Sequence, residues 1–413
     1  MNPNWKYVEF EKAVEICDNL RKPVNSKERA TRIDGKREDE LYPYYGATGQ
    51  VGYIDDYISD GEYVLLGEDG APFLNPFAEK AYLITGKTWV NNHAHVLKSK
   101  TNNKFLRFYL NSINYRDYVS GTTRLKLTQG QMKHILVPIP SEEEQEKIVL
   151  KLEEVFSQID EGIRTLTVAL EQLEIYRNSV LNEAFLGNFT KGKHIKTDSF
   201  CREASKEEKK KLPLIPNEWR YIALANLGDL GRGKSKHRPR NDSRLFDDGK
   251  YPFLQTSEVK AATKYITDYS KMYGEFGLQQ SKLWKAGTLC ITIAANIAET
   301  AFLGIDACFP DSVVGYTPSE KMNPWYVKYF IESQKLRLWA FAPATAQKNI
   351  NLDTLEKLII PYCDIEEQNE IVAEIENRMS VCDSIEKTIE DALLQAEALR
   401  YSTLMKAFEG GLA

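Results

Sequence analysis

The chain has 413 residues, of which 42% are hydrophobic and 27% charged, a composition typical of a globular protein with about two to four structural units. Its mean hydropathy is −0.44, and no apolar run approaches the ~20 residues of a membrane-spanning helix. The first residues lack the apolar core of a signal peptide, and the six cysteines form no Cys-x-x-Cys pair. The sequence therefore disfavours a membrane protein, a secreted disulfide scaffold and a closed zinc site, and it favours a cytoplasmic location with reduced thiols.

Residues 1–140 have the pattern of a mixed α/β domain. Short apolar runs at 62–66 and 81–85 predict strands, and residues 103–112 have the spacing of a helix. This region is mildly basic, with 19 cationic against 17 acidic residues. His93 and His95 would lie on one face of a strand, but with no evident third ligand we expect packing or a nucleic-acid contact there and no metal.

Two polar segments of this first domain are the best candidates for contact with DNA, because their side chains suit the reading of base edges or phosphates. The candidates are Lys87, Trp89, Asn91, Asn92 and His93 in one segment, and Thr122, Thr123, Arg124 and Lys126 in the other.

Residues 141–187 predict a long helix. Ser141 and three following glutamates are typical of a helix N-terminus, and apolar residues recur at alternating steps of four and three from Ile148 to Val180. Gly162 falls on this apolar seam, which predicts a close approach of a partner helix, and Gly187 suits the end of the helix. The helix would be roughly 65–70 Å long at ~1.5 Å per residue, and it is strongly acidic, with 11 acidic against 4 cationic residues.

Residues 188–217 are rich in lysine and end in Leu-Pro-Leu-Ile-Pro, which predicts a linker. Residues 218–363 predict a second α/β domain, with a strand at 288–293 and a helix at 325–333. This domain has 19 cationic against 15 acidic residues. The second set of DNA-binding candidates lies here, most densely between residues 231 and 240: Arg232, Lys234, Lys236, Arg238, Arg240, Gln255, Thr256, Thr345, Gln347 and Lys348. A run of cations is commonly a solvated surface, but this density favours phosphate or base contact.

Residues 364–413 predict a second long helix that repeats the first. Segments between Thr122 and Gly187 match those between Thr345 and Gly410 at an offset of 223 residues, and Trp5-Lys6-Tyr7-Val8 matches Trp219-Arg220-Tyr221-Ile222 at an offset of 214. The second helix is again acidic, with 12 acidic against 4 cationic residues. A heptad seam in both copies predicts an intramolecular coiled coil; the alternative is that each helix packs only on its own domain. Residues that match between the halves are better candidates for support of the fold or for phosphate contact. Residues that differ, such as Gln255-Thr-Ser against Gly46-Ala-Thr, are better candidates for reading the DNA sequence.

Two motifs suggest enzymatic chemistry without the required surroundings. Residues 228–235 match the phosphate-binding pattern G-x-x-x-x-G-K-S, but Pro239 makes a following helix unfavourable. Leu74-Asn-Pro-Phe is one proline short of the aminomethyltransferase signature Asn/Asp-Pro-Pro-aromatic. Because no Ser-His-Asp or Cys-His set stands out either, we expect a non-catalytic chain with no cofactor of its own.

The order of the motifs resembles the specificity subunit of type I restriction–modification systems. The residues that carry the resemblance include Ile135-Leu-Val-Pro with Glu143-Glu-Gln, Leu358-Ile-Ile-Pro with Glu366-Glu-Gln, and the two Ala-Phe-x-Gly helix ends. In the two domains they are Tyr42-Pro-Tyr-Tyr-Gly-Ala-Thr-Gly-Gln-Val-Gly-Tyr with Gly67-Glu-Asp-Gly, and Ala294-Ala-Asn-Ile with Asp311-Ser-Val-Val-Gly.

The resemblance implies an α+β fold with two pseudo-repeated target recognition domains, separated by a long antiparallel coiled-coil helix pair. It implies that each domain reads one half of a bipartite site in double-stranded DNA. It also implies that two modification (methyltransferase) subunits and restriction (translocase/nuclease) subunits are partners, and that these carry S-adenosylmethionine, ATP and Mg²⁺. The alternatives are a self-sufficient DNA methyltransferase or nuclease, and a coiled-coil scaffold without a DNA role.

Overall fold

The computed structural model describes residues 4–190, 212–294, 296–341 and 349–411. The chain divides into two compact units, the first formed by residues 1–169 and 388–413 and the second by residues 170–387. Each unit contains one head, made of sheets and short helices, and parts of two long helices, α5 (Glu142–Phe185) and α12 (Ile365–Glu409). Both long helices continue from one unit into the other.

The head of unit 1 is built from two four-stranded sheets, ordered β2-β9-β6-β7 and β4-β3-β8-β5, and a two-stranded ribbon, β1-β10. Strand β3 pairs parallel with β8, and the other strand pairs of this head are antiparallel. The strands are β1 (Lys6–Glu9), β2 (Val14–Ile16), β3 (Tyr42–Gly46), β4 (Gly49–Ile54), β5 (Ser59–Asp60), β6 (Tyr63–Gly67), β7 (Ala81–Ile84), β8 (Lys87–Val90), β9 (Ala94–Ser99) and β10 (Leu136–Ile139). The helices of the head are α1 (Phe10–Ala13), α2 (Ser26–Ile33), α3 (Asn103–Ser112) and α4 (Gln129–Met132).

The head of unit 2 has a five-stranded sheet, β12-β20-β17-β18-β14, a four-stranded sheet, β15-β13-β19-β16, and a ribbon, β11-β21. The strands are β11 (Arg220–Ala223), β12 (Gly228–Arg232), β13 (Tyr251–Phe253), β14 (Tyr265–Ile266), β15 (Lys271–Tyr273), β16 (Leu283–Trp284), β17 (Leu289–Thr292), β18 (Thr300–Leu303), β19 (Ala307–Cys308), β20 (Val313–Pro318) and β21 (Ile359–Tyr362). The helices are α7 (Thr256–Ala261), α8 (Glu275–Gln279), α9 (Pro324–Ser333), α10 (Lys335–Phe341) and α11 (Leu352–Glu356).

The two heads share one topology although their sequences diverge between the matched motifs. The order β2-β9-β6-β7 corresponds to β12-β20-β17-β18, and β4-β3-β8-β5 corresponds to β15-β13-β19-β16. The one parallel pair of unit 1, β3 with β8, has its counterpart in β13 with β19. The ribbons agree residue by residue, because Lys6 pairs with Ile139 and Arg220 with Tyr362. The duplication that the helices and ribbons reveal in the sequence therefore extends through both heads.

Each head packs its helix against the apolar ends of the long helices. In unit 1, Trp5, Phe105, Leu106 and Phe108 form a core with residues of α5 such as Leu152. In unit 2, Trp219, Tyr326, Phe330 and Ile331 form the equivalent core with Ile371 and Ile375 of α12. The helices predicted at 103–112 and 325–333 are present as α3 and α9, each with an asparagine N-cap, Asn102 and Asn323.

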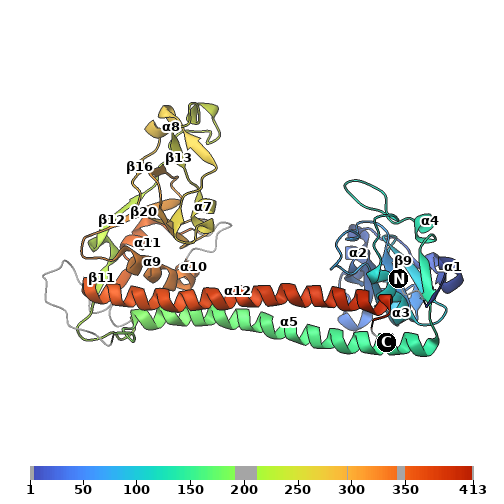
Figure 1. Ribbon diagram of the computed structural model, residues 1–413. Coiled ribbons are helices and arrows are strands. Elements are labelled where there is room, and N and C mark those ends of the chain that lie inside the picture. The colour runs from blue at the N-terminus through green and yellow to red at the C-terminus, as the bar shows by residue number, and fades with distance from the viewer. Residues whose placement is uncertain (1–3, 191–211, 295, 342–348, 412–413) are drawn as a thin grey trace. The chain divides into compact units, whose positions relative to one another are not determined.

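The long helices pair antiparallel, as Figure 1 shows. In unit 1, Asp160 of α5 forms an ion pair with Arg400 of α12. In unit 2, Arg177 of α5 forms ion pairs with Asp383, at 2.7 Å, and with Glu386, at 2.8 Å, of α12. Arg177 and Arg400 are matched positions of the repeat, as are Asp160 and Asp383, so the same ion pair forms once in each unit. This confirms the predicted antiparallel helix pair.

The predicted seam is only partly correct. Ile148, Leu152, Leu173 and Val180 are buried as expected. A Cβ on Gly162, however, would meet no heavy atom within 4 Å, so this glycine does not mark a close approach of two helices. Seam positions Tyr176, Ile385 and Leu399 are also exposed, by 47%, 44% and 53%. A straight helix drifts relative to a strict heptad repeat, so a long periodic pattern turns away from its partner where nothing imposes a supercoil.

The two helix entries are held to their heads by the same pair of contacts. The indole of Trp5 donates to Glu144 at 2.8 Å, and that of Trp219 donates to Glu367 at 3.1 Å. The buried amides of Gln145 and Gln368 donate to the carbonyls of Pro140 and Cys363, at 3.0 and 2.8 Å. The repeated Glu-Glu-Gln motif therefore has a structural role, because its last two residues join each long helix to the adjacent head.

Candidate nucleic-acid interface

Residues 232–244 of unit 2 form a loop rich in lysine and arginine, which we call the cationic loop. It starts at strand β12, which packs tightly on an aromatic stack. Gly231 of β12 pairs across the sheet with Gly315 of β20, and the indole of Trp284 covers both glycines. A Cβ would lie 2.6 Å from the indole at Gly231 and 2.7 Å from it at Gly315. Trp284 in turn stacks on Phe309, with 5.0 Å between the ring centroids. The base of the loop is therefore rigid.

These contacts explain the motif that matches a phosphate-binding loop. Residues 228–232 are a strand that pairs antiparallel with β20, not a loop that leads into a helix. A Cβ on Gly228 would lie 2.5 Å from the carbonyl oxygen of Thr317, and one on Gly233 would lie 2.3 Å from that of Pro310. The glycines are required by packing between strands, so the match to the nucleotide-binding pattern is fortuitous.

The cations of this loop divide into two groups. Arg232 donates to the backbone of Asp311, and Arg240 forms an ion pair with the Asp311 carboxylate at 2.8 Å. Lys234, Lys236 and Arg238 are exposed and form no ion pair with any carboxylate in the described part of the chain. The Arg238 guanidinium instead donates to the carbonyls of Ser235 and His237, which fixes the turn. Three of the five predicted cations are thus available to an external anion.

Beside the loop, Asp242 organises a second group of side chains. The Asp242 carboxylate accepts hydrogen bonds from Arg244, at 2.6 Å, and from the ring of His237, at 2.7 Å. These hydrogen bonds hold the pKa of Asp242 far below its ordinary value. Both His237 and Arg244 lie against the ring of Phe276, so the end of the loop is attached to α8.

The other predicted residues of unit 2 have different positions. Gln255 is the N-cap residue of α7 and forms a capping box with Glu258, and Thr256 is the first residue of that helix. Both side chains are half-buried, at the end of the strand next to the cationic loop. The predicted contacts Thr345, Gln347 and Lys348 lie outside the described residues.

In unit 1, the segment from Ser120 to Leu127 is attached to the acidic turn Gly67-Glu-Asp-Gly70. Arg124 forms an ion pair with Asp69 at 2.6 Å, and Lys126 forms one with Glu68 at 3.2 Å. The backbone N–H of Leu127 donates to the Glu68 carbonyl, and that of Gly70 donates to the Leu125 carbonyl. Both cations that the sequence singles out here are therefore already neutralised by carboxylates, while Thr122 and Thr123 at the tip are exposed.

A buried network of charges supports this turn. The His95 ring is fully buried and lies 2.8 Å from the Asp18 carboxylate and 2.9 Å from the Leu127 carbonyl. Arg21 joins Asp18 to Glu68. Burial by itself would raise the pKa of both carboxyls. The hydrogen bond from His95 lowers the pKa of Asp18, and the hydrogen bond from Arg21 lowers the pKa of Glu68. Together with neighbouring charges, these hydrogen bonds outweigh the effect of burial, so both pKa values lie below the ordinary value. His95 is thus a structural residue of this network.

The remaining predicted residues of unit 1 are on and after β8. Trp89 is only 4% exposed and its indole donates to the Lys22 carbonyl at 2.8 Å, so its side chain belongs to the core and not to a DNA contact, contrary to our expectation. Asn91 is buried as well, and its side chain accepts from the His93 backbone at 2.8 Å. Lys87 lies over the Tyr57 ring on the surface. Asn92 is exposed, and His93 faces Asp69 at 3.7 Å.

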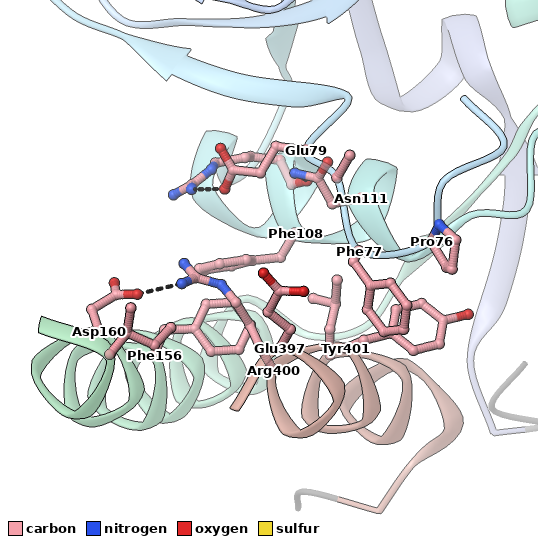
Figure 2. Close-up of a pocket in the computed structure, with 14 residues that line it drawn as sticks. Pro76, Phe77, Glu79, Phe108, Asn111, Phe156, Asp160, Glu397, Arg400 and Tyr401 are labelled. Carbon is pink, nitrogen blue, oxygen red and sulfur yellow. Dashed lines mark hydrogen bonds and ion pairs between the residues drawn. The ribbon is translucent and has the colours of Figure 1, made fainter. Parts of the chain in front are cut away.

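Unit 1 also contains a cavity of about 520 Å³ between its head and its helix pair. Figure 2 shows Pro76 and Phe77 at one side, with Tyr401 beside Phe77, and Phe156 near Asp160 toward the other side. Its walls are joined by ion pairs between Arg107 and Glu79, at 2.7 Å, and between Arg400 and Asp160. The Leu74-Asn-Pro-Phe motif thus contributes to the wall of this cavity, where the Asn75 side chain accepts from the Phe77 backbone at 3.0 Å.

Several kinds of site are not found in the described part of the chain. Residues 4–190, 212–294, 296–341 and 349–411 contain no group of three or more His, Cys, Asp or Glu side chains arranged to hold a metal ion. Five buried cysteines there, among them Cys290 and Cys308, are free thiols, whereas Cys201 lies outside the described residues. Within the same ranges, no helix combines the length and apolar character needed to cross a membrane.

Two heads of one fold, each presenting cations, on an acidic helix pair define a protein built to contact a polyanion at two places. The family model of the type I restriction modification DNA specificity domain matches residues 5–172 and again residues 216–395. The chain therefore belongs to this family, with one match in each half of its repeat, and it is a type I restriction–modification specificity subunit. The resemblance recognised in the sequence motifs is confirmed.

The comparisons with individual proteins agree with this assignment. The chain is 27% identical over 408 residues to a type I restriction enzyme specificity subunit of Haemophilus influenzae, a match that covers 95% of this chain and 92% of the relative. It is 24% identical over 428 residues to the EcoDI specificity subunit of Escherichia coli, covering 99% and 89%. The HsdS subunit from Thermoanaerobacter tengcongensis shares the fold, with a TM-score of 0.54, 17% identity and coverage of 100% and 98%. A chain from a structural study of assembly in a type I R-M system has a TM-score of 0.72 at 17% identity, covering 100% and 99%.

Proposed function

We propose that this chain is the non-catalytic DNA-reading and assembly subunit of a type I restriction–modification complex. Each head reads one half of a two-part sequence in double-stranded DNA, and the helix pair between the heads sets the gap. The S-adenosylmethionine, ATP and Mg²⁺ of the complex are bound by partner subunits, and the complex acts in the cytoplasm.

One observation carries the proposal: the same fold and the same helix entries occur twice, while the surface loops of the two heads differ. A duplicated scaffold needs identical residues where it packs, and different residues only where its two copies meet different partners. The shared residues are the ones that attach helix to head, such as Gln145 and Gln368. The loops differ at equivalent places, because the acidic residues Glu68 and Asp69 follow β6 in unit 1, whereas Ile293 and Ala294 follow the corresponding strand β17 in unit 2. Two different half-sites are the simplest partners for such a pair of surfaces.

The helix pair supplies a surface for the modification subunits. Tyr176 and Leu399 are matched positions of the repeat, and both are exposed beside the matched arginines Arg177 and Arg400. Each unit thus presents an exposed large side chain at this repeated position, next to the repeated interhelical Arg–Asp ion pair. Exposed apolar residues at repeated positions are typical of docking surfaces. Two such positions fit two modification subunits, one on each unit.

The experiment that tests DNA reading is selection of binding sites from random duplexes by the full-length chain together with its modification subunit. We expect enrichment of a gapped sequence with two specific parts. Enrichment of no sequence would favour the alternative of a coiled-coil scaffold. Methylation of DNA by the isolated chain with S-adenosylmethionine would favour the other alternative, a self-sufficient enzyme.

Docking is tested separately with two matched substitutions. Leu399→Asp and Tyr176→Asp each place a charge at one exposed helix position, and each should reduce the modification subunits bound per chain from two toward one, as measured by native mass spectrometry. Val168→Asp, at another exposed position of α5, is the control. Full occupancy in both variants would show that the modification subunits dock elsewhere.

A further inference from the structure

Two of the three lysines and arginines that the sequence pattern selects in unit 1 already have a carboxylate partner. Arg124 and Lys126 each face a carboxylate, as described above. In contrast, Lys22, Lys27 and Lys36 are exposed and form no ion pair with any carboxylate among the residues that the structure describes. They belong to a short segment, residues 21–37, that contains seven lysines and arginines against two acidic residues. We call residues 21–37 the α2 segment.

The α2 segment occupies the place in unit 1 that the cationic loop occupies in unit 2. It connects β2 to β3, and the cationic loop connects β12 to β13, which are the corresponding strands of the shared topology. Both connections begin at the same hydrogen bond. The Lys22 N–H donates to the Val90 carbonyl at the end of β8, and the Lys234 N–H donates to the Phe309 carbonyl just after β19. Lys22 and Lys234 are therefore equivalent residues of the two heads, although no sequence match relates them.

The α2 segment is attached to the sheet by two of its arginines, and the Lys22 ammonium also lies 6.0 Å from the Trp89 ring centroid. The Arg29 guanidinium lies 4.8 Å from the Tyr44 ring centroid and donates to the Val51 carbonyl at 3.0 Å. The Arg32 guanidinium lies 4.7 Å from the Trp89 ring centroid and forms an ion pair with Asp55 at 2.6 Å. No residue of α2 is buried, so these cation–aromatic contacts carry its packing on the sheet.

Gly52 permits this arrangement. Its φ is +144°, and a Cβ at this position would lie 2.4 Å from the Arg29 guanidinium. The glycine in the Gly-Gln-Val-Gly-Tyr motif is therefore needed for Arg29 to lie along β4. In unit 2 the cationic loop is attached in a comparable way, since Arg244 and His237 lie against Phe276.

From this equivalence we infer that Lys22, Lys27 and Lys36 form the phosphate-contacting surface of the first head, as Lys234 and Lys236 do in the second. The inference rests on the proposed function, since the ligand is the phosphate backbone of duplex DNA. Exposed ammonium groups without carboxylate partners gain the most from a phosphate, because they lose no existing ion pair on binding. The paired cations Arg124 and Lys126 would have to exchange one anion for another. The first head then positions DNA through the α2 segment, while its 120–127 segment contributes to reading.

The test measures binding of the full-length chain, with its modification subunit, to a duplex that carries the selected two-part site. The slope of log affinity against log salt falls by about 0.9 for each phosphate contact that is lost. The triple variant Lys22→Gln, Lys27→Gln, Lys36→Gln should lower this slope by about 2–3. The matched control is Lys6→Gln, Lys98→Gln, Arg116→Gln, which removes three exposed cations of unit 1 outside the segment and should change the slope by less than about 1.

Further arms separate folding, location and function. The variant with Lys22, Lys27 and Lys36 all replaced by arginine keeps the charges and should retain the wild-type slope. Lys22→Gln and Lys234→Gln should each lower the slope by a similar amount, since the two residues are equivalent. The inference is overturned if the Lys22→Gln, Lys27→Gln, Lys36→Gln variant has the same salt slope as the Lys6→Gln, Lys98→Gln, Arg116→Gln control. The proposed function stands in that case, provided that the wild-type chain reads a two-part site and Lys234→Gln lowers the slope. If the wild-type chain selects no sequence, the proposed function itself fails.

Discussion

Replacing Glu68 by glutamine should raise the affinity of the first head for non-specific DNA and lower its preference for the correct half-site. The Glu68 side chain is 12% exposed, and its carboxylate pairs with Arg21 and Lys126. A hydrogen bond to a charged group contributes about 1.5–3 kcal/mol, and glutamine retains part of one of the two. We therefore expect the charge network that supports the 120–127 segment, of which Lys126 is the member in that segment, to lose about 2–4 kcal/mol. A tenfold rise in the open population corresponds to about 1.4 kcal/mol, so the segment would open at least tenfold more often.

Two measurements report this change. Hydrogen exchange should accelerate at the backbone N–H groups of Lys126 and Leu127, which donate to Ser120 and Glu68. Binding to non-specific DNA should strengthen, because one negative charge near the duplex is removed, while the preference for the correct first half-site should fall. Asp69→Asn is the control, since the Arg124 partner of Asp69 is 62% exposed and such a pair contributes about 0–1 kcal/mol. The positioning role of Glu68 is refuted if Glu68→Gln strengthens binding to specific and non-specific DNA equally and leaves hydrogen exchange unchanged.

Three further predictions concern stability and spacing. The pKa values of Asp18 and Glu68 are lowered in the folded chain, so both carboxylates stabilise the fold above the ordinary carboxyl pKa of about 4. This contribution to the free energy of unfolding is lost as the pH falls below that value. Acid titration of unfolding should show the loss in the wild type and a smaller loss in Asp18→Asn. Gly231→Ala should destabilise unit 2 by about 1–3 kcal/mol, because its Cβ would lie 2.6 Å from the Trp284 indole. Gly162→Ala should stabilise the helix by about 0.5–1 kcal/mol, because the space around Gly162 is open. Chemical denaturation checks both, and destabilisation by Gly162→Ala would show a helix contact at that position. An insertion of four residues, about one helical turn, at one position of α5 should change the gap between the two half-sites and leave the half-site sequences unchanged. Site selection measures both. An unchanged gap would show that the helices do not set it.

The sequence alone was sufficient for the features that depend on local chemistry and on repetition. The acidic N-terminal turns and the apolar steps predict α5 and α12, and the offset of 223 residues relates Arg177 to Arg400 and Asp160 to Asp383 before any contact is known. The strands β6, β7 and β17 are short apolar runs between turn residues, and they were predicted because strand formation depends on that local pattern. Family membership was accessible for the same reason, since it rests on the order of such motifs.

Only the tertiary structure decided which cations are available. Arg124 and Lys22 have the same charge in the sequence, but Asp69 pairs with the first, and no carboxylate within residues 4–190, 212–294, 296–341 and 349–411 pairs with the second. Such pairs join residues far apart along the chain. The burial of Trp89 and the open surroundings of Gly162 are likewise set by elements distant in sequence. The equivalence of Lys22 and Lys234 is visible only from the sheet order, because surface loops are free to diverge in sequence while the backbone hydrogen bonds at their base are retained.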